Sequence, residues 1–219
     1  MRPTNTDRWR VACFDLDGTL VVGTTIRRHL GQHFSHEIIR ELDTKYAEGM
    51  ISTRQIAEAE ANLFDGVLQT EVEAALTTIP FIGGIVETLE VLRAMNIHIL
   101  LTTITWEFAS RHVARTYGFD AWTGCLMNES HPGKLSGRLK QVCDENDKRD
   151  FVLQYCKQWG VNVDQVFAVG DSRSDVPLFR VVGHSIAINA SPDAKAAAAC
   201  SIDTLNLTDV LKLVPGLLP

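Results

Sequence analysis

Two aspartates lie two residues apart, directly after a short apolar segment near the start of the chain. Val11 to Phe14 is apolar, and Asp15 and Asp17 follow before Gly18. Such a run is typical of a buried strand, and the glycine lets the backbone turn where the strand ends. Both carboxylates can then face one cavity, where like charges close together require a proton or a bound cation.

A second pair of acids follows another apolar segment, Val166 to Val169. Asp171 comes directly after Gly170, and Asp175 lies four residues further along the chain. Four acids without a cluster of histidine or cysteine favour a hard cation held by oxygen ligands, and Mg²⁺ is the expected ion. A single aspartate is more often a helix N-cap or a turn residue, but paired acids after two buried strands favour a site.

Possible phosphate-binding groups follow a third apolar segment. Thr102 and Thr103 come after Ile97 to Leu101, and Thr102 offers a hydroxyl and a backbone N–H near a helix start, a position that suits an anion. Lys148 is predicted to open a helix and to place its ammonium group on the phosphate. An ordinary solvated lysine is the alternative interpretation.

Strands alternate with helices through most of the chain, which predicts an α/β fold. We expect a Rossmann-like, mostly parallel sheet with helices on both faces. Ligands bind such sheets at the carboxyl ends of the strands, where the polar clusters described above fall. The expected strands are 11–14, 97–101, 166–170 and 185–188, and the expected helices are near 85–95, 106–117 and 148–159.

The segment from residue 24 to residue 78 has a different pattern. It contains no proline, and its apolar residues recur at helical spacing, which predicts an all-helical insert of three or four helices. We therefore expect an α/β core domain made of 1–22 and 81–219 and a helical cap domain at 23–80. A further stretch, 125–142, carries Pro-Gly and Gly signals that indicate a β-hairpin.

Composition excludes several classes of protein. Hydrophobic residues make up 45% of the 219 residues and the formal net charge is −6, without a Lys/Arg run that would indicate a nucleic-acid partner. The sequence shows no signal peptide and no apolar segment long enough to span a membrane. The five cysteines are scattered, which favours reduced thiols and a cytoplasmic location.

The ordered motifs resemble those of the haloacid dehalogenase-like hydrolases, over about residues 11 to 190. Within that superfamily they look most like the phosphoserine phosphatases, which have a type 1 helical cap. The motifs that carry the resemblance are Asp15-Leu16-Asp17-Gly18-Thr19-Leu20, Thr102, Lys148 and Gly170-Asp171-Ser172-Arg173-Ser174-Asp175.

The resemblance implies a role for each matching residue. Asp15 would be the nucleophile that forms an aspartyl-phosphate, and Asp17 would protonate the leaving oxygen and then activate water. The phosphoryl group would be bound by Thr102, Thr103 and Lys148. Mg²⁺ would be held by the carboxylates of Asp15 and Asp171 and by the backbone carbonyl of Asp17, with Asp175 supporting the site.

Two positions depart from the phosphoserine phosphatase pattern. Thr24 stands where those enzymes carry a glutamate that pairs with the substrate amine. Glu60 aligns with the cap arginine that binds the substrate carboxylate, and an acid cannot replace that bidentate donor. The departures predict a small phosphorylated metabolite other than phosphoserine as the substrate.

Three histidines on the first cap helix have no counterpart in the resemblance. His29, His33 and His36 share one helical face beside Arg27 and Arg28. Substrate contact through a second anionic group is one interpretation, which makes His29 and His33 specificity candidates. A solvated helix face is the more ordinary alternative.

The sequence therefore predicts a Mg²⁺-dependent phosphatase that acts on a small phosphorylated metabolite, as a monomer or a homodimer, without a nucleic-acid or membrane partner. A phosphotransferase or phosphomutase could use the same aspartyl-phosphate, and phosphoserine phosphatase proper is a further alternative. A dehalogenase is disfavoured because that branch lacks a second acid at Asp17. A non-catalytic binding protein is disfavoured because the acids and Lys148 are all retained.

Overall fold

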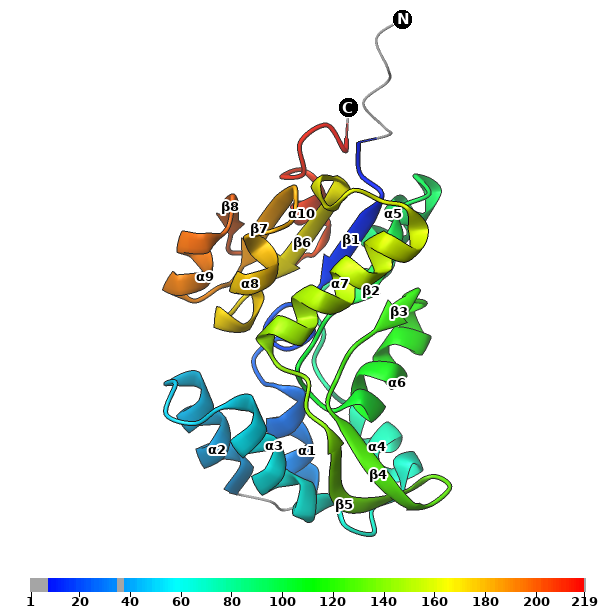
Figure 1. Cartoon of the computed structure of the whole chain (residues 1–219), viewed down its shortest axis with the longest axis vertical. Helices are drawn as coiled ribbons and strands as arrows, with labels where there is room; N and C mark the ends of the chain where they lie inside the picture. Colours follow the sequence, from blue (N-terminus) through cyan, green and yellow to red (C-terminus); the bar gives the residue numbers. More distant parts are fainter. Residues whose placement is uncertain (1–7, 35–37, 219) are drawn as a thin grey trace, which may run out of the picture.

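A six-stranded parallel sheet forms the centre of the protein (Figure 1). The computed structural model describes residues 8–34 and 38–218, and within them the strand order is β3-β2-β1-β6-β7-β8. The predicted parallel α/β sheet is thus confirmed. The strands are β1 (Val11–Phe14), β2 (His98–Leu101), β3 (Ala121–Trp122), β6 (Val166–Gly170), β7 (His184–Ile188) and β8 (Cys200–Ile202).

The register of the central strands brings their carboxyl ends to one level. Phe14 at the end of β1 pairs with Leu101 of β2 and with Val169 of β6. The ladder continues for one more residue, because the Asp15 N–H donates to the Val169 carbonyl at 2.9 Å and the Thr102 N–H donates to the Phe14 carbonyl at 2.8 Å. The chain segments that carry the predicted site residues therefore leave the sheet side by side.

Helices cover both faces of the sheet, because successive strand residues point to opposite faces. One hydrophobic cluster joins Phe14 and Leu101 to α5, α6 and α10, and the other joins Cys13 and Leu100 to α7, α8 and α9. The helices are α5 (Ile85–Ala94), α6 (Glu107–Tyr117), α7 (Glu145–Trp159), α8 (Val176–Phe179), α9 (Pro192–Ala197) and α10 (Thr208–Leu211).

The segment after β1 forms a helical layer beyond the carboxyl edge of the sheet (Figure 1). The Thr25 hydroxyl caps the first helix by accepting from the Arg28 N–H, and Ser52 begins the third helix in a capping box with Gln55. The elements of this layer in the described residues are α1 (Ile26–His33), α2 (Ile38–Ala47), α3 (Thr53–Ala61), the 3₁₀ turn η2 (Asn62–Phe64) and α4 (Gln69–Leu76).

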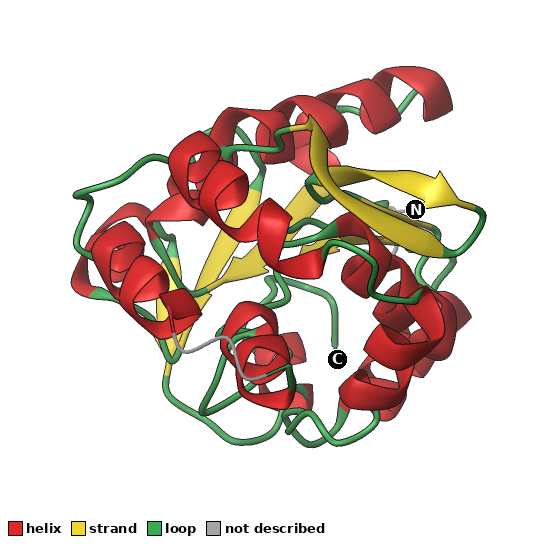
Figure 2. Ribbon diagram, turned by 90° about the horizontal axis from the view of Figure 1, so that it is seen from below, coloured by secondary structure: helices red, strands yellow, loops and turns green. Residues whose placement is uncertain are grey.

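The predicted hairpin is present as β4 (Leu126–His131) and β5 (Lys134–Gln141), and it lies beside the helical layer (Figure 2). Backbone hydrogen bonds join the two: Leu135 donates to the Val67 carbonyl at 2.9 Å and Gln69 donates to the Gly133 carbonyl at 2.8 Å. The hairpin is therefore in contact with the segment 23–80, although the predicted division of the chain grouped it with the core.

Two predictions about the whole chain can be compared with the structure. All five cysteines are free thiols, and four of them are buried. No helix within the described residues combines the length and the apolar character needed to cross a membrane.

Candidate active site

Three carboxylates meet at the carboxyl edge of the sheet. One oxygen from each of Asp15, Asp171 and Asp175 lies within 4.8 Å of the others. Gly18 makes the approach of the two loops possible, because a Cβ atom there would lie 2.1 Å from Asp171 Oδ2, and its φ of +80° is left-handed. The structure thus brings together the two acid pairs that lie far apart in the sequence.

Lys148 joins the first acid pair to the second. Its Nζ donates to Asp15 Oδ1 at 2.9 Å, to Asp175 Oδ1 at 2.7 Å and to Ser174 Oγ at 3.1 Å, and the side chain is fully buried. Burial lowers the pKa of Lys148, but the charges of Asp15 and Asp175 outweigh burial and raise it overall, so this lysine is held charged. Its helix, α7, begins three residues earlier than predicted, at Glu145, with Asp144 as N-cap.

Asp175 shapes the loop that carries Asp171. Its Oδ2 accepts from the backbone N–H groups of Asp171 and Ser172, at 3.0 and 3.1 Å. It does not border the cavity described below. This arrangement orients the Asp171 carboxylate, whose Oδ1 is buried without a hydrogen-bond partner among residues 8–34 and 38–218.

The charges and the donor types at this edge fit a hard divalent cation. Asp15 and Asp171 offer carboxylate oxygens, and the unpartnered Oδ1 of Asp171 is a free ligand atom. Burial raises the pKa of Asp15 to about 6, helped by the nearby charge of Asp175 and opposed by Lys148. Burial and the charges of Asp15 and Asp175 also raise the pKa of Asp171. A cation would relieve this repulsion and keep both carboxylates ionised.

Asp17 occupies a different environment from Asp15. Its Oδ1 accepts from the Ile26 N–H at the start of α1, at 2.5 Å, and its side chain borders the cavity. Burial raises the pKa of Asp17 to about 7, against the lowering effect of that hydrogen bond. A carboxyl group with a pKa near neutrality can both release and accept a proton at physiological pH.

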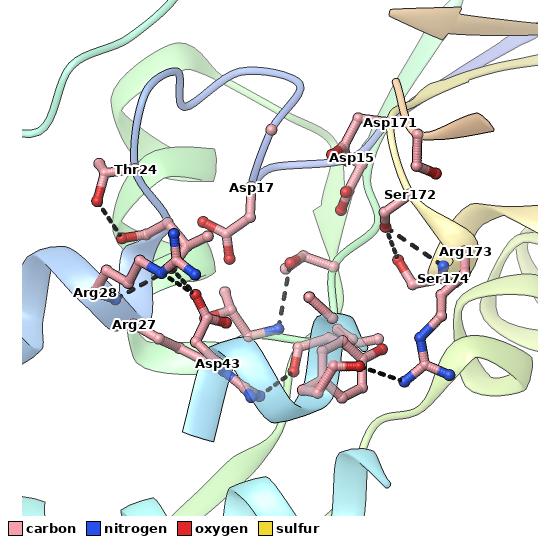
Figure 3. A pocket seen from close by; sticks show the side chains of 18 of the residues that line it. Asp15, Asp17, Thr24, Arg27, Arg28, Asp43, Asp171, Ser172, Arg173 and Ser174 are labelled. Carbon is pink, nitrogen blue, oxygen red and sulfur yellow. Dashed lines mark hydrogen bonds and ion pairs between the residues drawn. The ribbon is translucent and has the colours of Figure 1, made fainter. Parts of the chain in front are cut away.

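A cavity of about 360 Å³ separates these acids from the helical layer. Figure 3 shows Asp15 and Asp171 on one side, Arg27 and Arg28 on the other, and Asp17 between the two groups. The residues that border it come from the loops after β1, β2, β6 and β7, from α1 and α2, and from the start of α9. A cavity at the carboxyl ends of strands, with several polar groups converging on it, is a typical place for a small ligand.

The two predicted threonines are placed differently. Thr103 borders the cavity, and its backbone N–H donates to Thr123 Oγ1 at 2.8 Å. Thr102 is buried and does not border the cavity, and its hydroxyl donates to the Phe14 carbonyl at 3.4 Å. The geometry thus gives more support to Thr103 than to Thr102 as a ligand contact.

The two cap candidates for specificity also differ. Thr24 borders the cavity. Glu60 does not, because its side chain is fully buried behind α1, where Oε2 lies 3.5 Å from Arg27 Nε. Glu60, a candidate for substrate specificity, therefore lies away from the cavity and pairs with Arg27 from another helix.

The histidine face does not border the cavity either. His29 Nε2 lies 2.8 Å from the Ala75 carbonyl, at the end of α4, and His33 is exposed and packs edge-on against Phe34. His36 lies outside the described residues. Substrate contact by His29 and His33 therefore receives no support, and the ordinary interpretation of a helix surface fits better.

Several residues that border the cavity were not candidates. Arg173 lies within the second acid motif, and its guanidinium is 4.4 Å from the centre of the Tyr46 ring on α2. Asp43 pairs with Arg28 at 2.6 Å. Thr105 lies in the loop after β2. The position of Arg173 between Asp171 and Asp175 in the sequence could have identified it as a candidate. Asp43 and Thr105 reach the cavity only through contacts between distant segments, which the sequence does not show.

Comparison with known proteins decides the family. The model of the haloacid dehalogenase-like hydrolases matches residues 12–180. The chain belongs to this family. The site described above lies within the matched residues, as the resemblance of the motifs predicted.

Among curated proteins, the phosphoserine phosphatase of Methanocaldococcus jannaschii is 26% identical, over 94% of this chain and 97% of its own. That of Lactococcus lactis is 27% identical, over 93% and 94%. A solved phosphoserine phosphatase with an analogue of the phospho-aspartyl intermediate superimposes with a TM-score of 0.83 at 23% identity, covering 94% of this chain and 99% of its own. These likenesses agree with the predicted branch and fold.

Proposed function

We propose that this hydrolase is a Mg²⁺-dependent phosphatase that cleaves a small-metabolite phosphate monoester through an aspartyl-phosphate on Asp15. The observation that carries the proposal is the placement of Asp15. Its carboxylate borders the cavity close to Asp171, and its Oδ1 accepts a hydrogen bond from Lys148 Nζ at 2.9 Å. The curated relatives named phosphoserine phosphatases support the same reaction class.

The chain's own residues account for each proton and bond. Asp15 attacks phosphorus and forms the new P–O bond, while the ester P–O bond breaks and Asp17 gives its proton to the leaving oxygen. Asp17 then takes a proton from a water molecule that attacks the same phosphorus, which releases phosphate and restores Asp15. The pKa of about 7 for Asp17 suits both halves of this cycle.

Mg²⁺ would be held by Asp15, the backbone carbonyl of Asp17 and Asp171, with Asp175 orienting Asp171 through the loop N–H groups. When bound, it supplies positive charge that offsets the charge on the phosphoryl oxygens. Lys148 adds a fixed ammonium charge 2.9 Å from Asp15 Oδ1, and Thr103 is the predicted phosphate-binding threonine that borders the cavity.

The substrate is proposed to be a metabolite other than phosphoserine. Glu60 is turned away from the cavity towards Arg27, and Thr24 places a neutral hydroxyl at the cavity wall. A cationic amine would therefore find no additional carboxylate from either of these positions.

A panel of phosphate monoesters, assayed for released phosphate with and without Mg²⁺, tests the proposal. Phosphoserine belongs in the panel, because selective turnover of it would overturn the proposed preference. The Asp15→Asn variant should lose hydrolysis and should not acquire label from a ³²P-ester under acid quench. Transfer of the phosphoryl group to an added alcohol, without net release of phosphate, would instead indicate a phosphotransferase.

A further inference from the structure

The cap side of the cavity contains a buried arginine with unused hydrogen-bonding capacity. Arg27 is 4% exposed and borders the cavity, and its Nη2 donates to the Ile104 carbonyl at 3.0 Å. Its Nε lies 3.5 Å from Glu60, but within the described part of the chain neither Glu60 oxygen has a hydrogen-bond partner. Because a guanidinium has five N–H donors, Arg27 keeps donors for another acceptor.

A second unused donor lies in the same wall. Thr105 follows the residue whose carbonyl binds Arg27, and it is 1% exposed and borders the cavity. Its Oγ1 is buried and makes no hydrogen bond to any residue that the structure describes. A buried hydroxyl without a partner is costly, so a ligand oxygen that reaches it would gain a favourable contact.

The other two arginines at the cavity are more exposed: the Arg28 and Arg173 side chains are 38% and 37% exposed, against 5% for Arg27. Arg28 Nε lies 2.6 Å from Asp43 Oδ2. Arg173 Nη2 donates to the Tyr46 carbonyl at 3.1 Å, and Nη1 lies 3.8 Å from Glu145. Figure 3 shows Arg27 and Arg28 across the cavity from Asp15, and Arg27 is the buried one of the three arginines, so its charge is the least screened by solvent.

We propose that Arg27 and Thr105 form a subsite for a second anionic group, a carboxylate, on the phosphorylated substrate, and that Glu60 positions Arg27. This inference rests on the proposed function, which places the phosphate at Asp15. Glu60 Oε2 lies 3.5 Å from Arg27 Nε and offsets part of the Arg27 charge, so a singly charged carboxylate leaves less uncompensated charge in the buried site than a second phosphate would. The substrate class is therefore a small phosphorylated hydroxy acid.

Matched esters test the carboxylate preference directly. 2-Phosphoglycolate and ethyl phosphate differ in one carboxylate, and propane-1,3-diyl bisphosphate supplies a second phosphate instead. The measured quantity is called the preference: it is the ratio of kcat/KM for an ester with two anionic groups to kcat/KM for ethyl phosphate. The wild type should favour the carboxylate over ethyl phosphate by at least tenfold and should favour it over the bisphosphate.

The variant Arg27→Met/Glu60→Gln removes the buried pair together, which leaves no buried charge alone. We expect its carboxylate preference to fall roughly 10- to 100-fold, the range for a lost hydrogen bond to a charged group. Thr105→Val should lower the preference by roughly fivefold, as expected for a neutral hydrogen bond. Arg54→Met/Glu58→Gln, an exposed pair of the same types on α3, is the matched control and should leave the ratio unchanged.

Binding separates this proposal from the proposed function. Calorimetry of the same esters with Asp15→Asn measures the preference without turnover, and circular dichroism checks that each variant folds. If the wild type hydrolyses none of the esters and the preference is still seen in binding, the subsite is supported and the phosphatase is contradicted. The subsite is overturned if the wild type has equal kcat/KM for 2-phosphoglycolate and ethyl phosphate. It is also overturned if Arg27→Met/Glu60→Gln leaves the carboxylate preference intact. Stronger binding of the bisphosphate than of the carboxylate also overturns it.

Discussion

At the scale of single residues, the site depends on Lys148, which is the cation buried between two carboxylates. It donates to both Asp15 and Asp175 and is fully buried. A buried pair of this kind is weak evidence for net stability, but removal of one member leaves the others uncompensated. Lys148 therefore affects both the fold and the orientation of Asp15.

Lys148→Met should lower the free energy of unfolding by about 3 kcal/mol at pH 7 and abolish hydrolysis. The reason is that Asp15 and Asp175 lose their common counter-charge in a buried site. Urea denaturation and a phosphate-release assay measure the two effects. Lys157→Met, an exposed position on the same helix, should change stability by less than about 0.5 kcal/mol, and equal losses in the two variants would contradict this account.

Glu60 should make stability depend on pH. Burial raises its pKa from 4.5 to about 7, and Arg27 opposes that rise only in part. The folded state therefore holds the Glu60 proton more tightly than the unfolded chain does. This contribution to stability is fully present below pH 4.5 and is lost as the pH rises through about 7.

Glu60→Gln should remove that contribution. The difference in unfolding free energy between variant and wild type is expected to change by about 2–3 kcal/mol between pH 4.5 and pH 8, in favour of the variant at high pH. Urea denaturation across this range measures it, and Glu58→Gln, exposed on the same helix, is the control. Parallel curves for Glu60→Gln and wild type would refute the assignment.

At the scale of elements, the loop between β1 and α1 sets how closely the two acid motifs approach. Gly18 and Gly23 both lie in this loop with left-handed φ, +80° and +73°. A Cβ atom at Gly18 would overlap the Asp171 carboxylate, whereas a Cβ atom at Gly23 would have nothing within 4 Å. Substitutions at the two glycines therefore distinguish the effect of backbone strain from the effect of blocking the close approach of Asp171.

Gly23→Ala should cost about 1–2 kcal/mol of stability, as a left-handed residue with a side chain does. Gly18→Ala carries the same strain and must also displace Asp171, so its activity should fall at least about 100-fold. Thermal unfolding and kcat/KM of both variants make the comparison. Similar activity in Gly18→Ala and Gly23→Ala would show that the approach of the loops is not required.

At the scale of the whole molecule, Arg173 connects the carboxyl edge of the sheet to the helical layer. It extends from the loop after β6 to α2, where it donates to the Tyr46 carbonyl, and towards Glu145 at the start of α7. Three segments that are distant in sequence thus meet at one side chain. The helical layer is expected to open more readily when this contact is lost.

Arg173→Met should raise KM roughly three- to tenfold through the lost hydrogen bond and cation–π contact. Amide hydrogen exchange of peptides from α2 should accelerate, while exchange in β1 should not change. Arg180→Met, at the exposed end of α8, is the control. Unchanged exchange in α2 would mean that Arg173 does not hold the two layers together.

Local patterns predicted the larger elements well. The strands β1, β2, β6 and β7 and the helices α5, α6 and α7 were all expected, because their apolar runs and turn residues lie within one continuous segment. The edge strands β3 and β8 were missed, since strands of two and three residues carry too little pattern. Their pairing is decided by neighbouring strands.

The sequence alone determined the chemical groups of the site and the strand ends that present them. Asp15, Asp17 and Asp171 follow buried runs, and parallel strands that share a register must bring such positions to one edge. Only the tertiary structure decided that Lys148 lies between two acids and that Glu60 pairs with Arg27. Those pairings depend on burial, which forces charges from distant segments to find partners that no local spacing specifies.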